Sequence, residues 1–286
     1  MGGDGSKEEG SEDSWGGGAS RGDYGSVRRH CYQSPRRAPD NPAYRSVPGG
    51  DLARASLASV PSEERNKMVD GIQIFLDSGS IEDIEKYATD PQIEGFTTNP
   101  SLLRKSGIVA YRPFANRVLG IVGKKEVSFE VIADDLETMG RQAREIASWG
   151  RNVWVKIPIT TTAGDSTLPL VETLEDVNVN LTAVFTTSQI DAARHYLKPK
   201  DIMSVFCGRI NDTQRREPYF AYRTFRTLYA STRHVMAIHQ ARQAGYDIIT
   251  MTPDLVAKLA LKGKDLNEYS LETVKQFHRD SQGIVL

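Results

Sequence analysis

Short apolar or alternating runs recur along the chain from Gly71 onward, and a segment with the spacing of an amphipathic helix follows each run. The helical segments include IEDIEKYA, DLETMGRQAREIASW, SQIDAARHYL and HVMAIHQARQAG. Strands that alternate with helices in this way predict parallel βαβ units. The eight strand-like runs cover residues 73–77, 95–99, 127–132, 153–160, 177–185, 202–210, 227–233 and 247–252.

Eight such units predict an α/β protein with a single (β/α)8 TIM barrel over residues 71–286. A doubly wound open sheet is the alternative architecture. The segment after the first run, DSGSIEDIEKY, lacks the G-x-G-x-x-G phosphate-binding pattern of many such sheets. The barrel is therefore the favoured fold.

Polar residues gather on one face of several predicted strands, and branched apolar residues gather on the other. Side chains alternate between the two faces of a strand, and one face of a barrel strand points into the centre. Most of the polar residues lie toward the carboxyl ends of their strands, where barrel enzymes place their chemistry. The alternation groups Thr97 with Asn99, Ser128 with Glu130, Lys156 with Trp154 and Pro158, Asn180 with Thr182, and Ser231 with Arg233.

The composition narrows the possible partners. The 286 residues are 39% hydrophobic and carry a formal charge of −1, which argues against nonspecific binding of nucleic acid. The basic stretch QRREPYFAYRTFRT is interpreted as a solvated helix or loop face, with RNA contact as the weaker alternative. No apolar run approaches the roughly 18 residues that span a bilayer. Two cysteines, Cys31 and Cys207, fit a reducing cytoplasm.

The first part of the chain has a different amino-acid composition. Residues 1–50 hold 11 of the 24 glycines, and GGDGSKEEGSEDSWGGGAS offers no apolar surface to bury. Such a segment cannot offset its own ordering entropy, so we expect residues 1–66 to be a disordered extension without a function. Its early acidic residues and lack of an apolar core fit a secretory or transit peptide poorly.

Lys156 is the main candidate for chemistry. It lies inside a strand among Val, Trp, Ile and Pro neighbours, where lysine is rare because an ammonium group loses its hydration. Burial of a lysine lowers the pKa of its amine, and a neutral amine attacks a ketone or aldehyde to form a Schiff base. The alternative is an ion pair with Glu130 or Asp77 that only fills the barrel.

Asp77 and Glu130 supply two carboxylates on different predicted strands, and imine chemistry needs a proton transfer at every step. Capping of the following helix is the alternative role for Asp77. Hydrogen bonds to a polyhydroxylated substrate, or internal bracing of the barrel, are expected from Thr97, Asn99, Asn180 and Thr182.

Arg209 and Arg233 follow adjacent predicted strands, with Ser231 between them in sequence. Two guanidinium groups and a hydroxyl can hold a phosphate through charge-assisted hydrogen bonds, and surface salt bridges are the alternative. The five histidines form no H-E-x-x-H pattern, and no cysteine pair has zinc spacing. A zinc-dependent aldolase is therefore disfavoured, and no metal or other cofactor is expected.

From about Gln73 to the C-terminus the chain resembles the transaldolase family, and in particular its small single-barrel members. The matching motifs occur in family order over about 210 residues: FLDSG, GFTTNPSLL, VSFEV, VWVKIPIT, NVNLTAVFTTSQ, SVFCGRIND and LYASTRH. The segment before Gly71 has no counterpart in the family. The eighth run IITMTPDLV, Cys207 and the stretch RINDTQRREPYFAYR depart from the family pattern, which leaves the acceptor aldehyde open.

The resemblance implies a class I mechanism and a role for each matching residue. Lys156 matches the Schiff-base lysine and Asp77 the acid/base aspartate, while Glu130 and Thr182 match the pair that positions a catalytic water. The positions that contact substrate correspond to Thr97, Asn99, Asn180 and Ser204, and those of the phosphate site to Arg209, Ser231 and Arg233.

The implied activity is transfer of a dihydroxyacetone unit from a ketose phosphate, such as sedoheptulose 7-phosphate or fructose 6-phosphate, to an aldehyde. The family also contains an aldolase that releases free dihydroxyacetone. That branch resembles this chain less, because it has Gln at the position of Glu130 and Tyr at that of Phe206. A non-catalytic barrel that binds sugar phosphates is a third reading. The resemblance further implies a cytoplasmic homo-oligomer in which the C-terminal helix contacts neighbours.

Overall fold

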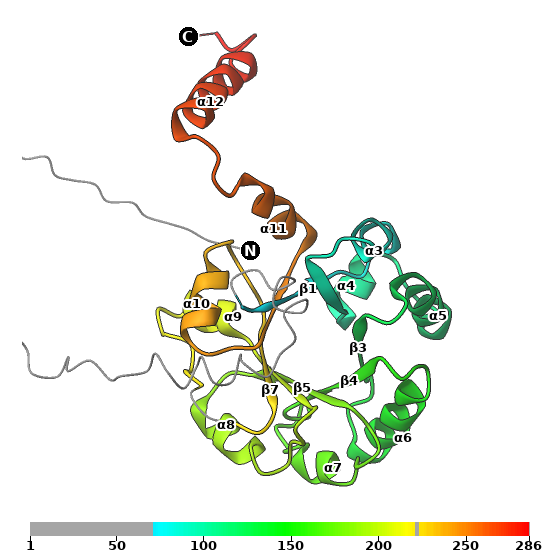
Figure 1. The fold of residues 1–286 in the computed structure, drawn as a ribbon. Coiled ribbons are helices and arrows are strands. Elements are labelled where there is room, and N and C mark those ends of the chain that lie inside the picture. Colours follow the sequence, from blue (N-terminus) through cyan, green and yellow to red (C-terminus); the bar gives the residue numbers. More distant parts are fainter. Residues whose placement is uncertain (1–70, 221–222, 286) are drawn as a thin grey trace, which may run out of the picture. The chain divides into compact units, whose positions relative to one another are not determined.

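The computed structural model describes residues 71–220 and 223–285. The expected disordered extension, residues 1–66, lies outside the described residues. Eight parallel strands pair in sequence order and the last pairs with the first, so the sheet is a closed barrel. The predicted TIM barrel is thus confirmed, and Figure 1 shows helices lying outside the ring of strands. The strands are β1 Gln73–Asp77, β2 Ile93–Thr97, β3 Glu126–Glu130, β4 Val153–Pro158, β5 Val179–Val184, β6 Ile202–Val205, β7 Arg226–Tyr229 and β8 Ile248–Met251.

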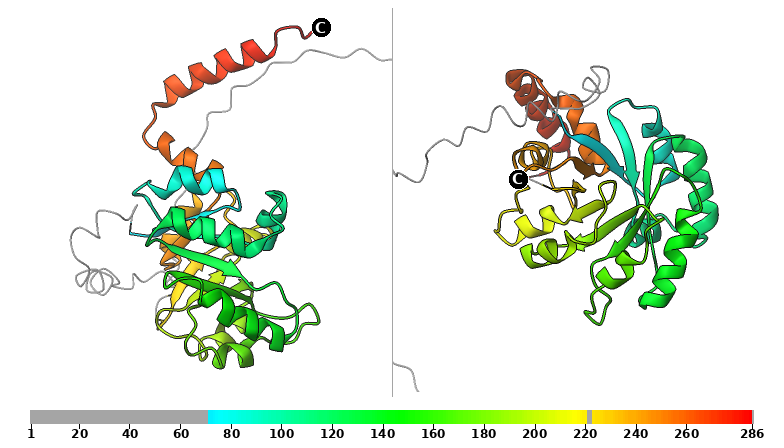
Figure 2. Two further views of the ribbon diagram at one scale, coloured as in Figure 1. Left: turned by 90° about the vertical axis from the view of Figure 1, so that its right-hand side faces the viewer. Right: turned by 60° about the horizontal axis from the view of Figure 1, so that its bottom comes forward.

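Helices follow the strands, and Figure 2 shows them from two further sides. Several begin at the capping residues that their sequences supply: Ser80 accepts from Asp83 N before α3, and Asp135 accepts from Thr138 N before α6. The helices are α3 Ile81–Ala88, α4 Pro100–Lys105, α5 Tyr111–Val122, α6 Leu136–Ala147, α7 Leu168–Glu172, α8 Thr187–Ala193, α9 Cys207–Asp212, α10 Ala237–Gln243, α11 Pro253–Ala257, the 3-10 helix η1 Lys258–Leu261 and α12 Leu266–Asp280.

The sixth and seventh strands end earlier than the sequence pattern predicts. β6 stops at Val205, and residues 207–210, expected in the strand, belong to α9. β7 stops at Tyr229, and Ser231 has a φ of 62°, a left-handed conformation that cannot continue a strand. The predicted grouping of Ser231 and Arg233 on one strand face is therefore wrong, because both residues lie in the loop after β7.

Two apolar clusters stabilise the barrel. The larger cluster fills the space between strands and helices with branched side chains such as Val127, Val155 and Leu181. The smaller cluster lies on the inward strand positions and consists of Phe75, Ile202, Leu228, Ala230 and Ile248, with Trp154 and Phe206 packed against it. This interior layer separates the two ends of the barrel, as side-chain layers do in TIM barrels.

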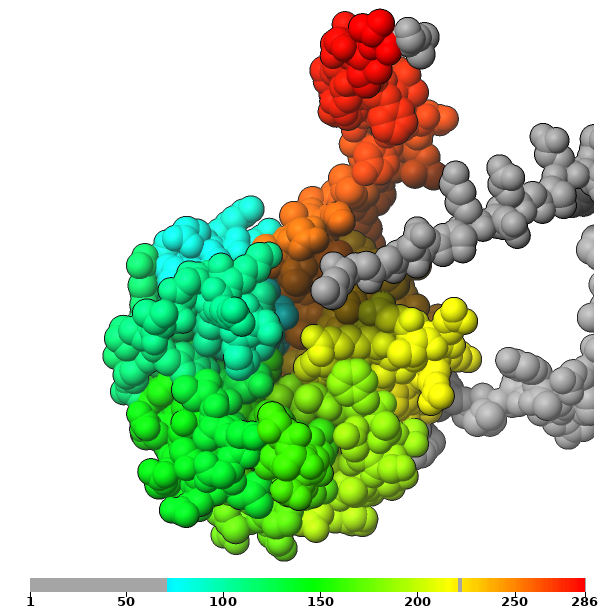
Figure 3. All heavy atoms as spheres, turned by 180° about the vertical axis from the view of Figure 1, so that it is seen from behind, coloured from blue at the N-terminus to red at the C-terminus, as the bar shows by residue number. Residues whose placement is uncertain are grey.

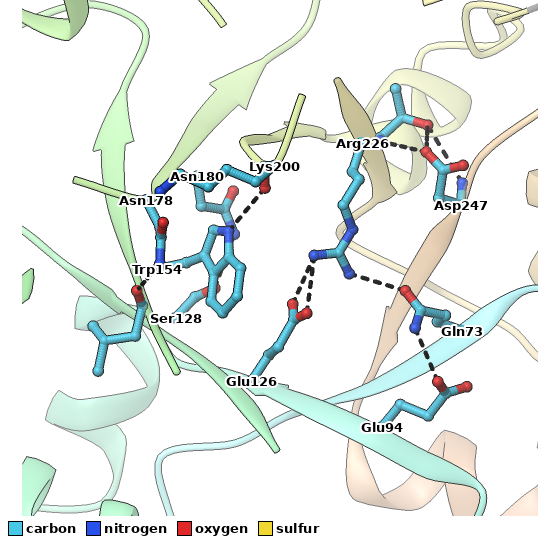
Figure 4. Close-up of polar contacts among 12 residues, drawn as sticks. Gln73, Glu94, Glu126, Ser128, Trp154, Asn178, Asn180, Lys200, Arg226 and Asp247 are labelled. Carbon is cyan, nitrogen blue, oxygen red and sulfur yellow. Dashed lines mark hydrogen bonds and ion pairs between the residues drawn. The ribbon is translucent and has the colours of Figure 1, made fainter. Parts of the chain in front are cut away.

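Polar contacts close the amino-terminal end of the barrel, where the strands begin (Figure 4). The Arg226 guanidinium on β7 donates to both carboxylate oxygens of Glu126 on β3, at 3.0 and 2.9 Å, and to Gln73 on β1 at 2.9 Å. Gln73 in turn donates to Glu94 on β2 at 2.9 Å. The Arg226 guanidinium thus links strands on opposite sides of the ring. The candidate catalytic residues lie at the other end, where the strands finish.

A substitution at Gly95 on β2 can test how tightly this interior is packed. A Cβ at Gly95 would lie 2.6 Å from the ring of Phe75, on the neighbouring strand. We expect Gly95→Ala to lower the free energy of unfolding by about 1–3 kcal/mol, because the closed ring leaves the phenyl group little room to move.

Gly120→Ala is the matched control for this prediction. Gly120 lies in α5, where an added Cβ meets nothing within 4 Å. Alanine there should stabilise the protein by about 0.5–1 kcal/mol. Urea unfolding of the two variants measures both effects, and equal stabilities of Gly95→Ala and the wild type would contradict the packing described.

Candidate active site

Most of the predicted site residues meet at the carboxyl end of the barrel. Asp77, Thr97 and Glu130 are the last residues of β1, β2 and β3, and Lys156 lies near the end of β4. The strand register places Asp77 beside Thr97, Glu130 beside Lys156, Lys156 beside Asn180, and Pro158 beside Thr182. Neighbouring strands therefore bring an amine, two carboxylates and several hydrogen-bonding groups into one region.

Lys156 is buried, with 6% of the residue exposed. Its Nζ donates to the backbone carbonyl oxygen of Thr98 at 2.8 Å. No ion pair joins Lys156 to Asp77 or Glu130 in the part of the chain that the structure describes. The alternative of a direct ion pair that fills the barrel is therefore not observed, and the amine is held by one neutral acceptor.

Asp77 accepts a hydrogen bond from Thr97 Oγ1 at 2.7 Å, and Thr97 in turn lies 2.6 Å from Thr250 Oγ1 on β8. Burial raises the pKa of the Asp77 carboxyl, although the charge of Lys156 and bonds from Thr97 and Asn99 oppose the rise. Helix capping, the alternative role for this residue, falls to Ser80 instead. The carboxyl is thus oriented from its neighbouring strand and shielded from water.

Glu130 lies at the end of β3 beside Lys156. Its backbone N–H donates to the Tyr111 hydroxyl at 2.8 Å, and that hydroxyl donates to the Glu130 carbonyl at 3.1 Å. Burial raises the pKa of the Glu130 carboxyl, and the negative charge of Asp77 raises it further, whereas Lys156 lowers it. Tyr111 is a positioning contact that the sequence pattern did not reveal, because it comes from the first turn of α5.

A chain of hydrogen bonds joins buried side chains on β3, β5 and β6. Ser204 Oγ donates to Asn180 Oδ1 at 2.6 Å, and Asn180 Nδ2 donates to Ser128 Oγ at 3.0 Å. All three residues are at most 1% exposed. These bonds fix the orientation of Asn180 beside Lys156, so internal bracing is part of its role.

Thr182 is 2% exposed and precedes a distortion of β5. The register with β6 shifts between Leu181 and Val184, and Ala183 there has a φ of 57°. A left-handed alanine costs about 1–2 kcal/mol, and a bulge re-aims the side chains beside it. Asn99 is not part of β2 but the N-cap of α4, where its side chain accepts from Leu102 N at 3.0 Å.

The predicted phosphate-binding residues lie at the rim. Arg209, on α9, is exposed and stacks over the Phe206 ring with 5.2 Å between its Cζ and the ring centroid. Arg233 donates to Asp212 Oδ2 at 3.2 and 2.9 Å. α9 and the loop after β7 touch at Gly208, where a Cβ would lie 1.7 Å from the Ser231 carbonyl oxygen. The segments that carry the two arginines are therefore in contact, and Arg233 is also part of a surface salt bridge.

The described residues contain no group of three or more His, Cys, Asp or Glu side chains that could hold a metal ion. Among the same residues, no helix is both long and apolar enough to cross a bilayer.

A buried lysine and two carboxylates lie at the carboxyl end of a closed parallel barrel, the end where barrel enzymes place their active sites. Residues 74–285 match the family model described as transaldolase/fructose-6-phosphate aldolase, and the chain belongs to this family. A probable transaldolase of Dehalococcoides mccartyi is 34% identical over 193 residues, covering 63% of this chain and 86% of the relative. A probable transaldolase of Hyphomonas neptunium is 32% identical over 215 residues, covering 71% of this chain and 94% of the relative.

A 2,3-dimethylmalate lyase overlaps 75% of this chain and 84% of its own with a TM-score of 0.42 and 12% identity. This similarity is too remote to bear on function.

The raised pKa of the Glu130 carboxyl has a consequence for stability. A carboxyl with a higher pKa in the folded than in the unfolded protein favours folding when protonated, and stability falls as the pH rises through the folded-state pKa. We therefore expect Glu130→Gln to be more stable than the wild type at pH 7.5, with a gain that shrinks as the pH falls toward 4.

Thermal unfolding across this pH range measures the gain. Glu137→Gln, on an exposed position of α6, controls for the loss of one negative charge. A gain for Glu130→Gln that is the same at pH 4 and pH 7.5, or absent at both, would contradict the assigned burial of this carboxyl.

Proposed function

We propose that this chain is a class I transaldolase, which transfers a dihydroxyacetone unit between sugar phosphates through a Schiff base on Lys156. The observation that supports this most is the buried amine at the carboxyl end of the barrel, with Asp77 and Glu130 on strands near it. The Lys156 amine donates a hydrogen bond to the Thr98 carbonyl oxygen, and its nitrogen lone pair is proposed to attack the carbonyl carbon of a substrate.

In the proposed reaction, the Lys156 amine attacks C2 of a ketose phosphate, such as sedoheptulose 7-phosphate or fructose 6-phosphate. Loss of water from the carbinolamine gives an imine, which accepts the electron pair of the C3–C4 bond when that bond breaks. Asp77 takes the proton of the C4 hydroxyl, and an aldose phosphate leaves. The dihydroxyacetone unit stays on Lys156 as an enamine, adds to a second aldehyde with proton return from Asp77, and is released by water.

The two carboxyls suit these proton transfers because burial raises the pKa of each one. A group that both takes and gives a proton works best when its pKa lies close to the operating pH. Glu130 and Thr182 are proposed to hold the water that is lost and regained at the imine. Thr97, Asn99, Asn180 and Ser204 are proposed to bind the hydroxyl groups of the substrate.

Arg209, Ser231 and Arg233 are proposed to hold the phosphate. The two guanidinium groups come from α9 and the loop after β7, which meet at Gly208 and Ser231. Asp212, the carboxylate partner of Arg233, then has to share this arginine with the incoming phosphate. A fixed phosphate keeps the reacting carbon near Lys156, which lowers the entropic part of the barrier.

The fructose 6-phosphate aldolase is the second candidate function, since the family includes it. Phe206 favours the transferase. Its ring packs against Phe185 at 5.4 Å and under Arg209, and it has no hydroxyl group to hand a proton to the enamine. The enamine is then left to react with an aldehyde.

A homo-oligomer stays a prediction. No residue of α12 is buried, and the helix exposes apolar side chains, among them Leu271, Val274 and Phe277. This surface is available for contacts between copies of the chain, and a monomeric mass of the full chain in light scattering would contradict the prediction. Catalysis in the cytoplasm likewise remains an expectation from the sequence.

An assay of both products tests the proposed function. Sedoheptulose 7-phosphate is supplied with and without glyceraldehyde 3-phosphate, and fructose 6-phosphate and free dihydroxyacetone are quantified. A transaldolase gives fructose 6-phosphate only with the acceptor and little free dihydroxyacetone in either case. Steady release of dihydroxyacetone would identify the aldolase, and binding without either product would identify a non-catalytic barrel.

Arg233→Ala adds a second arm to the same assay. Loss of a charge-assisted contact of about 1.5–3 kcal/mol should raise KM for the ketose phosphate by roughly 10- to 100-fold. Turnover of an unphosphorylated ketose should change little. Equal effects on both substrates would argue against the phosphate contact.

A further inference from the structure

A hollow of about 730 Å³ lies beside the barrel mouth, between α9, the segment 213–220 and α10. Its volume falls in the range of small-molecule sites. Figure 3 shows that the yellow part of the chain, which includes this segment, reaches the surface. The hollow is separate from the proposed catalytic residues, because its lining is Asn211, Arg215, Arg216, Glu217, Tyr219, His234, Gln240, Gln243 and Ala244.

The lining is cationic and rich in hydrogen-bond donors. Arg215 and Arg216 form no ion pair with a carboxylate among the residues 71–220 and 223–285. By contrast, Arg223 and Arg226 nearby in sequence each pair with an acidic side chain. Two guanidinium groups without a carboxylate partner at one hollow favour an anion, whose negative charge offsets theirs.

Glu217, the one carboxylate of the lining, is hydrogen-bonded to the side chain of Asn211. With the Asn211 amide oriented so that its nitrogen faces acceptors, it donates to Glu217 Oε2 at 3.0 Å and to the Arg215 carbonyl at 2.9 Å. The amide oxygen then accepts from the Tyr229 hydroxyl at 3.0 Å. The negative charge of Glu217 also raises the pKa of the buried Cys207 thiol, after the larger effect of burial. The carboxylate of Glu217 is thus held toward α9, and the lining carries two guanidinium groups against one carboxylate.

The hollow adjoins the proposed phosphate site without being part of it. Asn211 and Asp212 are consecutive, as are Arg233 and His234. Asp212 and Arg233 form the ion pair at the rim, while Asn211 and His234 line the hollow.

We propose that the hollow binds a small molecule with a diphosphate group, held by Arg215 and Arg216. The planar fork of each guanidinium matches two oxygens of a phosphate group, and a pair of forks matches a diphosphate better than a single phosphate. A wholly apolar ligand does not fit, because every lining residue except Ala244 has a polar or charged side chain. The amides of Gln240 and Gln243 supply donors for the remaining oxygens.

Calorimetric titration of the full chain with inorganic pyrophosphate, at fixed ionic strength and pH 7.5, tests the proposal. The double variant Arg215→Gln/Arg216→Gln should weaken binding at least about tenfold, as expected for lost charge-assisted bonds. The matched control is Arg104→Gln/Lys105→Gln, an adjacent pair of exposed cations on α4, and it should bind like the wild type.

Arg233→Ala separates the hollow from the barrel mouth and should retain pyrophosphate binding. Three results would overturn the proposal: no measurable binding by the wild type, equal losses in the double variant and its control, or loss of binding in Arg233→Ala alone. The titration needs no turnover, so its outcome is independent of whether the chain is a transaldolase.

Kinetics with sugar monophosphates then show whether the diphosphate group belongs to a larger substrate or to a separate ligand. The double variant should keep the kcat and KM of the wild type, because neither arginine belongs to the catalytic site. Pyrophosphate that raises KM competitively indicates that the diphosphate belongs to a larger substrate which spans both regions. Pyrophosphate that binds without changing KM indicates a separate ligand.

Discussion

Burial of the Lys156 amine is the constraint on which the rest of the site depends. A closed ring of parallel strands sends alternate side chains to its centre, and those near the carboxyl ends converge. An ammonium group there loses much of its hydration, and the amine has one backbone carbonyl as its partner. The side chain is therefore held at the carboxyl end of the barrel, where water has little access.

The neighbouring polar groups are largely satisfied among themselves, which keeps them in place. Thr97 connects Asp77 to Thr250 across β1, β2 and β8, and Asn180 is held between Ser128 and Ser204. At the opposite end of the barrel, Arg226 joins three strands through carboxylate and amide oxygens. These contacts hold the strands together at both ends of the barrel. A site held in place in this way reduces the entropic cost of aligning a substrate.

The repeat of strand-like and helical segments predicted the parallel βαβ units, and the missing G-x-G-x-x-G pattern favoured a closed barrel over an open sheet. Alternation also placed Asp77, Glu130 and Lys156 toward one centre, as the register confirms. Strand ends were less predictable. The run 202–210 continues into α9, where Gly208 lies close to the Ser231 carbonyl of the loop after β7, a contact between segments distant in sequence. The sequence pattern did not predict the contacts of Tyr111 and Thr98. Tyr111 reaches Glu130 from α5, and Thr98 acts through its backbone carbonyl, and both contacts form only in the folded chain.

Reduction with borohydride in the presence of fructose 6-phosphate tests the central claim most directly, because it converts an imine into a stable amine. The account predicts a dihydroxyacetone-derived adduct on the peptide that contains Lys156, found by mass spectrometry, and no adduct in Lys156→Met. An adduct on another lysine, or continued transfer by Lys156→Met, would contradict it.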